Sequence, residues 1–99
     1  MRPSLAYSRA LIERGAEIME VEPDEVHGKS RGCEDAVTVR RAVAGVLRER
    51  GWTLTKIARV LYRDHSSISH SIPIHWRWLE SDADYRYLVA ELRKLQPDC

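Results

Sequence analysis

The sequence predicts an all-α fold, a small helical domain that contains a helix-turn-helix. The chain has 99 residues, of which 43% are hydrophobic, which is enough for one core and short for a second. Strand signals are weak, because no long run alternates apolar and polar residues and no Asn-Gly or Asp-Gly hairpin turn occurs. Apolar residues recur instead at the three- and four-residue spacing of amphipathic helices. We therefore expect a single domain over residues 1–99.

The first part of the chain predicts one long helix and one short one. In a helix over residues 4–20, with Gly15 as a weak point, one face would carry the apolar side chains of Leu5, Ile12, Ala16 and Met19. Pro23 suits the first turn of a helix, so a short second helix is expected over residues 23–27.

The middle of the chain predicts two more helices. Asp35 can cap the first and Gly51 can end it. Its apolar face would consist of Val39, Ala42, Val43, Val46 and Leu47. Thr53 can cap the next helix, which has only two turns. The apolar face of that helix would consist of Leu54, Ile57, Ala58 and Leu61.

A turn at residues 62–64 leads to a helix of unusual composition. Asp64 or His65 would lie near its N-cap, and the run to residue 72 is rich in short hydroxyls and imidazoles. Only Ile68 and Ile72 offer an inward stripe. Most of this helix therefore has a surface that a core would not accommodate.

The last quarter of the chain predicts a break and a final helix. Pro73 is expected to kink its helix or to start a new one that runs through Trp76 and Leu79. Ser81 is the expected N-cap of the last helix. That helix would bury Tyr85, Leu88, Leu92 and Leu95.

Basic and acidic residues separate along the chain, although the net charge is only +1. Residues 1–27 hold three basic and six acidic side chains, residues 28–80 hold ten and five, and residues 81–99 hold three and four. A basic centre can bind phosphate, although a solvated helical surface would show the same pattern.

Membrane and secreted classes are disfavoured. No stretch has the roughly 18 uninterrupted apolar residues of a membrane-spanning helix, and the N-terminus lacks the pattern of a signal peptide. Cys33 and Cys99 are too far apart in sequence to form a paired metal or redox motif, and two cysteines make no disulfide framework. We expect a cytoplasmic protein without a cofactor.

Residues 54–72 have the order and length of a helix-turn-helix. In that motif the first helix holds the second at a fixed angle. The second helix enters the major groove with hydrogen-bonding groups that match base edges. An ordinary helical hairpin with a polar outer face is the alternative. The polar series Asp64-His65-Ser66-Ser67 favours DNA binding.

The run Arg63-Asp64-His65-Ser66-Ser67-Ile68-Ser69-His70 resembles the RDHTTVxH motif of the C-terminal, DNA-binding domain of the bacterial replication initiator DnaA. Residues 21–31 resemble the short helix and basic loop of that domain, and Arg40 or Arg41 opens a helix like its next one. The resemblance covers roughly residues 7–95. It implies a DnaA-like or Trp-repressor-like helical fold. No Gly-rich phosphate-binding loop occurs, so nucleotide hydrolysis is not expected.

The resemblance implies that five residues read the bases. Asp64 and His65 would face base edges in the major groove, Ser66 and Ser67 would lie beside them, and His70 would follow one turn further on. An aspartate can accept from the amino group of cytosine or adenine, and an imidazole can donate or accept.

The resemblance also implies a set of basic contacts. Lys29 and Arg31 would lie at the adjacent minor groove or phosphates, and Arg63 would pair with a phosphate near the reading helix. Lys56 and Arg41 would add to the salt-dependent affinity.

The chain departs from the DnaA pattern just before the motif, within it and after it, where Pro73 falls at a point at which the family's helix often continues. Tyr62 stands where the family usually has glycine, in a turn that favours positive φ. Ser66 and Ser67 replace threonines and lack the methyl group that could touch a thymine methyl. The replacement of these threonines by serines predicts a base preference that differs from that of the family.

Metal binding and catalysis are weaker interpretations of the same residues. His65, His70 and His75 recur every five residues, a spacing that rotates around a helix. A serine beside Asp64 and a histidine could act as a nucleophile, but a helix-borne row has no oxyanion loop. The sequence therefore predicts neither an enzyme nor a metal protein.

The three tryptophans could stack on bases or belong to the core. Trp52 and Trp76 fall beside the apolar stripes, so both are expected in the core, and Trp78 fits either position.

The function expected from the sequence is sequence-specific binding of double-stranded DNA at DnaA-box-like sites, in the regulation of replication or transcription. One alternative is an adaptor that keeps the fold and binds a protein through its acidic N-terminal helix or its C-terminal helix. Another is the DNA-binding subunit of a transposase-type assembly.

Overall fold

The computed structural model of the chain describes residues 3–27 and 34–95, and all regular structure in these two ranges is α-helical. The helices are α1 (Pro3–Met19), α2 (Pro23–His27), α3 (Glu34–Glu49), α4 (Leu54–Leu61), α5 (His65–Ser81) and α6 (Ala83–Arg93). This confirms the all-α prediction. Within the two ranges, none of the helices has the length and apolar character needed to cross a membrane.

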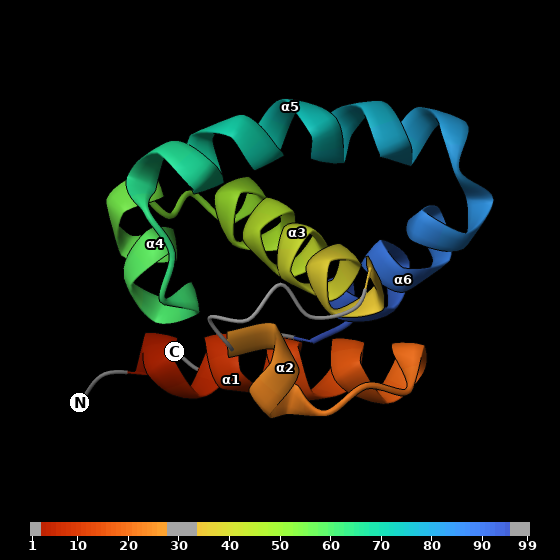
Figure 1. Cartoon of the computed structure of the whole chain (residues 1–99), viewed down its shortest axis with the longest axis horizontal. Helices are drawn as coiled ribbons and strands as arrows, with labels where there is room; N and C mark the ends of the chain where they lie inside the picture. Colours follow the sequence, from red (N-terminus) through yellow and green to blue (C-terminus); the bar gives the residue numbers. More distant parts are fainter. Residues whose placement is uncertain (1–2, 28–33, 96–99) are drawn as a thin grey trace.

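Helix α3 is the centre of the fold. It packs against each of the other five helices, and Figure 1 shows α5 on one side of it and α1 with α2 on the other. The predicted apolar face of α3 is confirmed, because Val39, Ala42, Val43, Val46 and Leu47 are all fully buried.

Helix α1 crosses α3 closely at Gly15. A β-carbon at this position would lie 2.8 Å from Cγ1 of Val39, so the glycine permits the close approach of the two helices. Met19 is partly buried against the core, and the side chain of Leu5 lies outside the described part of the chain. The remaining buried apolar side chains of α1 are Tyr7, Leu11, Ile12 and Ala16.

Three helices end at a residue in the left-handed conformation. These residues are Glu20 (φ 60°) after α1, Gly51 (φ 92°) after α3 and Tyr62 (φ 56°) after α4. In each case the next amide donates back to a carbonyl five residues earlier, as in a Schellman motif. The three bonds are Val21 N to Ala16 O (2.9 Å), Trp52 N to Leu47 O (3.1 Å) and Arg63 N to Ala58 O (3.0 Å).

The predicted N-cap of α4, Thr53, is confirmed. The predicted N-caps of α3 and α6, Asp35 and Ser81, are wrong. The side chain of Thr53 accepts from the amide of Lys56 at 3.2 Å. Helix α3 begins at Glu34, so Asp35 lies in its first turn. A carboxylate is favourable there because it interacts with the positive end of the helix dipole.

Ser81 is the last residue of α5 and not the N-cap of α6. Its hydroxyl donates to the carbonyl of Arg77 at 3.1 Å, a bond typical of serine inside a helix. Asp82 takes the cap position, and its carboxylate accepts from the amide of Tyr85 at 3.1 Å.

Helix α5 continues through Pro73, so the predicted new helix does not exist. Pro73 lies on the exposed side of α5, while Ile68 and His75 anchor the helix to the core on either side of it. Trp76 was expected in the core and is 46% exposed. His75, one position earlier, takes the inward position instead.

Candidate nucleic-acid interface

Helices α4 and α5 form a packed pair joined by a three-residue turn. Ile57, Ala58 and Leu61 are buried on the inner face of α4, and Ile68 is buried on α5. The left-handed residue Tyr62 reverses the chain after α4. The core therefore fixes the direction in which α5 starts.

The first two turns of α5 carry a group of exposed polar side chains. The five residues predicted to read bases, Asp64, His65, Ser66, Ser67 and His70, are all exposed. Asp64 occupies the N-cap with extended backbone angles, and its carboxylate makes no capping hydrogen bond to the helix. The structure thus brings these five side chains to one end of one helix and exposes them to solvent.

Arg63 lies close to Arg40 of α3. Burial, together with the nearby charges of Arg63 and Arg41, lowers the pKa of Arg40 to about 10, so it stays protonated at neutral pH. Nε of Arg40 donates to the carbonyl of Val26 at 2.8 Å, and its other nitrogen donates to the carbonyl of Glu25 at 3.4 Å. The charges of Arg40 and Arg63 therefore repel each other, and Arg40 is held at the end of α2 by its bonds to the backbone.

The predicted site did not include Arg40. The sequence predicts both Arg40 and Arg41 in the first half of a helix, and the resemblance to the DnaA family implies a DNA contact for Arg41 but not for Arg40. The proximity of Arg40 to Arg63 depends on how α3 packs, and no local sequence signal reports it.

Arg41 lies away from the start of α5. Its guanidinium stacks 4.5 Å from the ring centroid of Trp78, near the other end of α5. Trp78 is fourteen residues beyond Asp64, about 21 Å along a helix. Burial lowers the pKa of Arg41. The structure does not bring this predicted contact together with the exposed group on α5.

The other predicted basic contacts have different positions. Lys56 is exposed in the first turn of α4, and its ammonium lies 4.4 Å from the ring centroid of Trp52. Lys29 and Arg31 lie outside the described residues.

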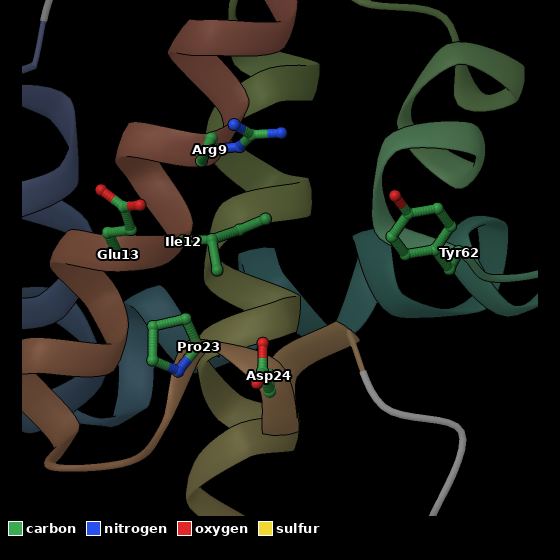
Figure 2. Close-up of a pocket in the computed structure, with 6 residues that line it drawn as sticks. All are labelled: Arg9, Ile12, Glu13, Pro23, Asp24 and Tyr62. Carbon is green, nitrogen blue, oxygen red and sulfur yellow. The ribbon is translucent and has the colours of Figure 1, made fainter.

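A groove of about 380 Å³ lies beside the turn after α4 (Figure 2). The ring of Tyr62, which is 67% exposed, forms one side of it. The other lining residues come from α1 and α2 and are Arg9, Ile12, Glu13, Pro23 and Asp24. The groove combines an aromatic ring with two carboxylates and one guanidinium.

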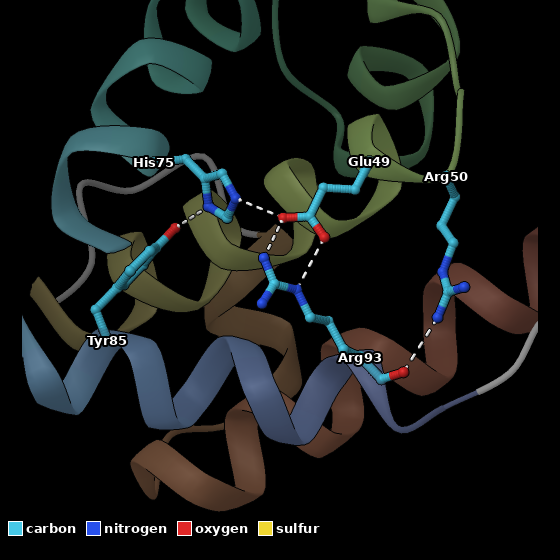
Figure 3. A network of polar contacts seen from close by, with 5 residues as sticks. All are labelled: Glu49, Arg50, His75, Tyr85 and Arg93. Atoms are coloured by element: carbon cyan, nitrogen blue, oxygen red, sulfur yellow. Dashed lines mark hydrogen bonds and ion pairs between the residues drawn. The ribbon is translucent and has the colours of Figure 1, made fainter. Parts of the chain in front are cut away.

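His75 belongs to a polar network between α3, α5 and α6 (Figure 3). Nδ1 of its fully buried imidazole lies 2.6 Å from the hydroxyl of Tyr85, and Nε2 lies 3.1 Å from a carboxylate oxygen of Glu49. Arg93 donates to both oxygens of the same carboxylate, at 2.9 and 2.8 Å.

The chemistry of these groups fixes the direction of the hydrogen bonds. A carboxylate only accepts, so Nε2 of neutral His75 donates to Glu49, and Nδ1 accepts from the hydroxyl of Tyr85. Burial lowers the pKa of His75, although the bond to Glu49 acts in the opposite direction. Burial also raises the pKa of Tyr85. The network joins α3, α5 and α6 through the buried side chains of His75 and Tyr85.

No protein-family model matches the chain, and no curated protein is similar to it. These comparisons give no support to the resemblance to the DnaA family, which depends on the sequence segments named above.

Proposed function

We propose that this chain binds double-stranded DNA sequence-specifically, through a helix-turn-helix formed by α4, the turn at residues 62–64 and α5. The observation that carries the proposal is the exposed polar group at the start of α5, on a helix that α4 holds in a fixed position. The major groove is about 12 Å wide and admits one α-helix. Short hydroxyl side chains let such a helix approach the base edges closely.

The five exposed side chains have complementary roles in this proposal. The carboxylate of Asp64 accepts from an amino group of cytosine or adenine, while His65 and His70 each donate to or accept from a base edge. Ser66 and Ser67 add hydroxyls that can do either. Each good base contact contributes about 1–3 kcal/mol of discrimination.

Phosphate contacts supply the sequence-independent part of the affinity. Arg40 and Arg63 place two positive charges near one another beside the start of α5, where a phosphate of the DNA backbone can bind. By resemblance to the DnaA family, Lys29 and Arg31 extend these contacts. Lys56 adds an exposed cation on α4.

The same resemblance supports DnaA-box-like sites as the target, in the regulation of replication or transcription. The test is fluorescence anisotropy with a labelled DnaA-box duplex and a scrambled duplex at two salt concentrations. We expect at least a tenfold preference for the box, which corresponds to about 1.4 kcal/mol.

A matched pair of variants isolates the reading helix in this test. Asp64→Ala should abolish the preference, whereas Asp84→Ala, which removes an exposed carboxylate from α6, should preserve it. Equal, salt-sensitive binding to both duplexes would show a backbone binder without base readout. Absence of binding at low salt would refute the proposal.

A second candidate is an adaptor that binds a protein through its acidic N-terminal region. The groove between Tyr62 and helices α1 and α2 favours it, because an exposed aromatic ring beside Glu13 and Asp24 can accommodate a basic side chain. This candidate predicts that Tyr62→Ala impairs function in the cell while Asp64→Ala does not.

A further inference from the structure

Most arginines described by the structure have a partner within the protein. The side chains of Arg14 and Arg93 pair with carboxylates, those of Arg40, Arg48, Arg50 and Arg86 donate to backbone carbonyls, and that of Arg41 stacks on Trp78. Arg9, Arg59 and Arg77 are exposed, and the side chain of each forms neither a hydrogen bond nor an ion pair with any residue in the described ranges. Of these three, Arg77 lies on α5.

Arg77 lies on the same stripe of α5 as part of the proposed reading surface. Ser66, His70, Pro73 and Arg77 follow one another at i, i+4, i+7 and i+11, a spacing that keeps side chains on one face of a helix. All four are exposed. A helix whose Ser66 and His70 face DNA therefore turns Arg77 toward DNA as well.

The distance along α5 from Ser66 to Arg77 is greater than the width of the major groove of DNA. Arg77 follows Ser66 by eleven residues, about 16 Å along the helix. The major groove is about 12 Å wide. When the first turns of α5 lie in the groove with the helix axis directed across it, the far end of the helix lies at the opposite phosphate chain.

We propose that Arg77 binds a phosphate of the strand across the major groove from the strand that Arg63 contacts. This inference rests on the proposed function. Long reading helices in other folds contact the backbone through their C-terminal ends, and a guanidinium is well suited to a phosphate because it can donate two parallel hydrogen bonds. α5 is thereby anchored at both ends, which fixes its orientation in the groove.

The first test is the salt dependence of binding to the DnaA-box duplex. Arg77→Ala should lower the affinity about three- to tenfold for both the box and the scrambled duplex, and should reduce the slope of log K against log salt by about 1. Arg14→Ala is the matched control, because it makes the same change in charge on α1, on the opposite side of α3 from α5 (Figure 1).

The second test locates the contact by phosphate ethylation interference. The wild-type protein should show two groups of sensitive phosphates on opposite strands, and Arg77→Ala should lose one group and keep the other. An unchanged slope or two unchanged groups for Arg77→Ala would overturn the inference while leaving the proposed function intact, as would an equal loss for Arg14→Ala. Absence of wild-type binding to either duplex would instead refute the proposed function.

Discussion

The imidazole of His75 lies directly against Gly45 of α3, where a β-carbon would overlap the ring. Both residues are fully covered by the rest of the protein. The glycine therefore makes the space in which a histidine can be buried between α3 and α5. Both nitrogens of the ring still find partners, Tyr85 on α6 and Glu49 on α3.

Gly45→Ala should destabilise the protein by about 1–3 kcal/mol, because the added methyl group forces the imidazole or α5 to move. Urea unfolding measured by circular dichroism tests this. In a His75→Ala background the same substitution should cost clearly less, since the ring is gone. Equal costs in the two backgrounds would contradict the packing described above.

Acidification should destabilise the protein through His75. Burial lowers the pKa of His75 below its ordinary value of 6.5, so the unfolded chain binds a proton more readily than the folded one. Stability should therefore fall as the pH drops below about 6.5, until the lower pKa of the folded state is passed. Thermal unfolding between pH 7.5 and 5.5 measures the slope. His75→Gln, which cannot titrate, should flatten it in this window.

Glu49 contributes to stability in a separate and more acidic window. Burial alone would raise the pKa of Glu49, but hydrogen bonds from Arg93 and His75 outweigh burial and lower it. The resulting stabilisation is present above about 4.5 and is lost as the pH falls through the lower pKa of the folded state.

Glu49→Ala should cost about 1–3 kcal/mol at pH 7, because it leaves the buried Nε2–H of His75 without its acceptor. Glu17→Ala is the control. It also removes a carboxylate that pairs with an arginine, but the side chain of Glu17 is 71% exposed, so we expect little change. Similar losses for the two variants in chemical denaturation would contradict a structural role for the network.

Tyr62→Gly should stabilise the fold by about 1 kcal/mol, because a side chain in the left-handed conformation is strained and glycine is not. Glu20→Gly should act in the same direction, since Glu20 occupies the equivalent position after α1. Gly51→Ala should have the opposite effect. Midpoints of urea unfolding compare the three variants, and destabilisation by Tyr62→Gly would show that contacts of the ring outweigh the backbone strain.

The helices of this chain could be predicted from sequence where apolar periodicity and caps agree. The buried stripe of α3 and the Thr53 cap of α4 are examples. Periodicity gave the wrong inward residue on α5, because it ranks Trp76 as more apolar than His75. Burial of His75 depends on Gly45 and Tyr85, which are distant in sequence and supply space and a hydrogen bond.

The proposed site likewise contains some residues that could be predicted from the sequence and others that could not. The exposed residues at the start of α5 are contiguous in sequence, so a motif could identify them. Arg40 reaches Arg63 only through the packing of α3 and the end of α2, across 23 positions of sequence. Arg41, one residue later on the helix, points to Trp78 instead. The distribution of charge along the sequence could not show which of these two arginines lies near Arg63 and which stacks on Trp78.

Helix α3 contacts every other helix, and the buried apolar side chains of the described residues form one cluster. Local opening that exposes α3 therefore opens the whole domain, and folding should be all-or-none. In native-state hydrogen exchange, the most protected amides of α3, α5 and α6 should exchange with one common free energy. Any DNA sequence that binds α5 would then slow exchange in α1 as well, although α1 lies on the far side of the molecule.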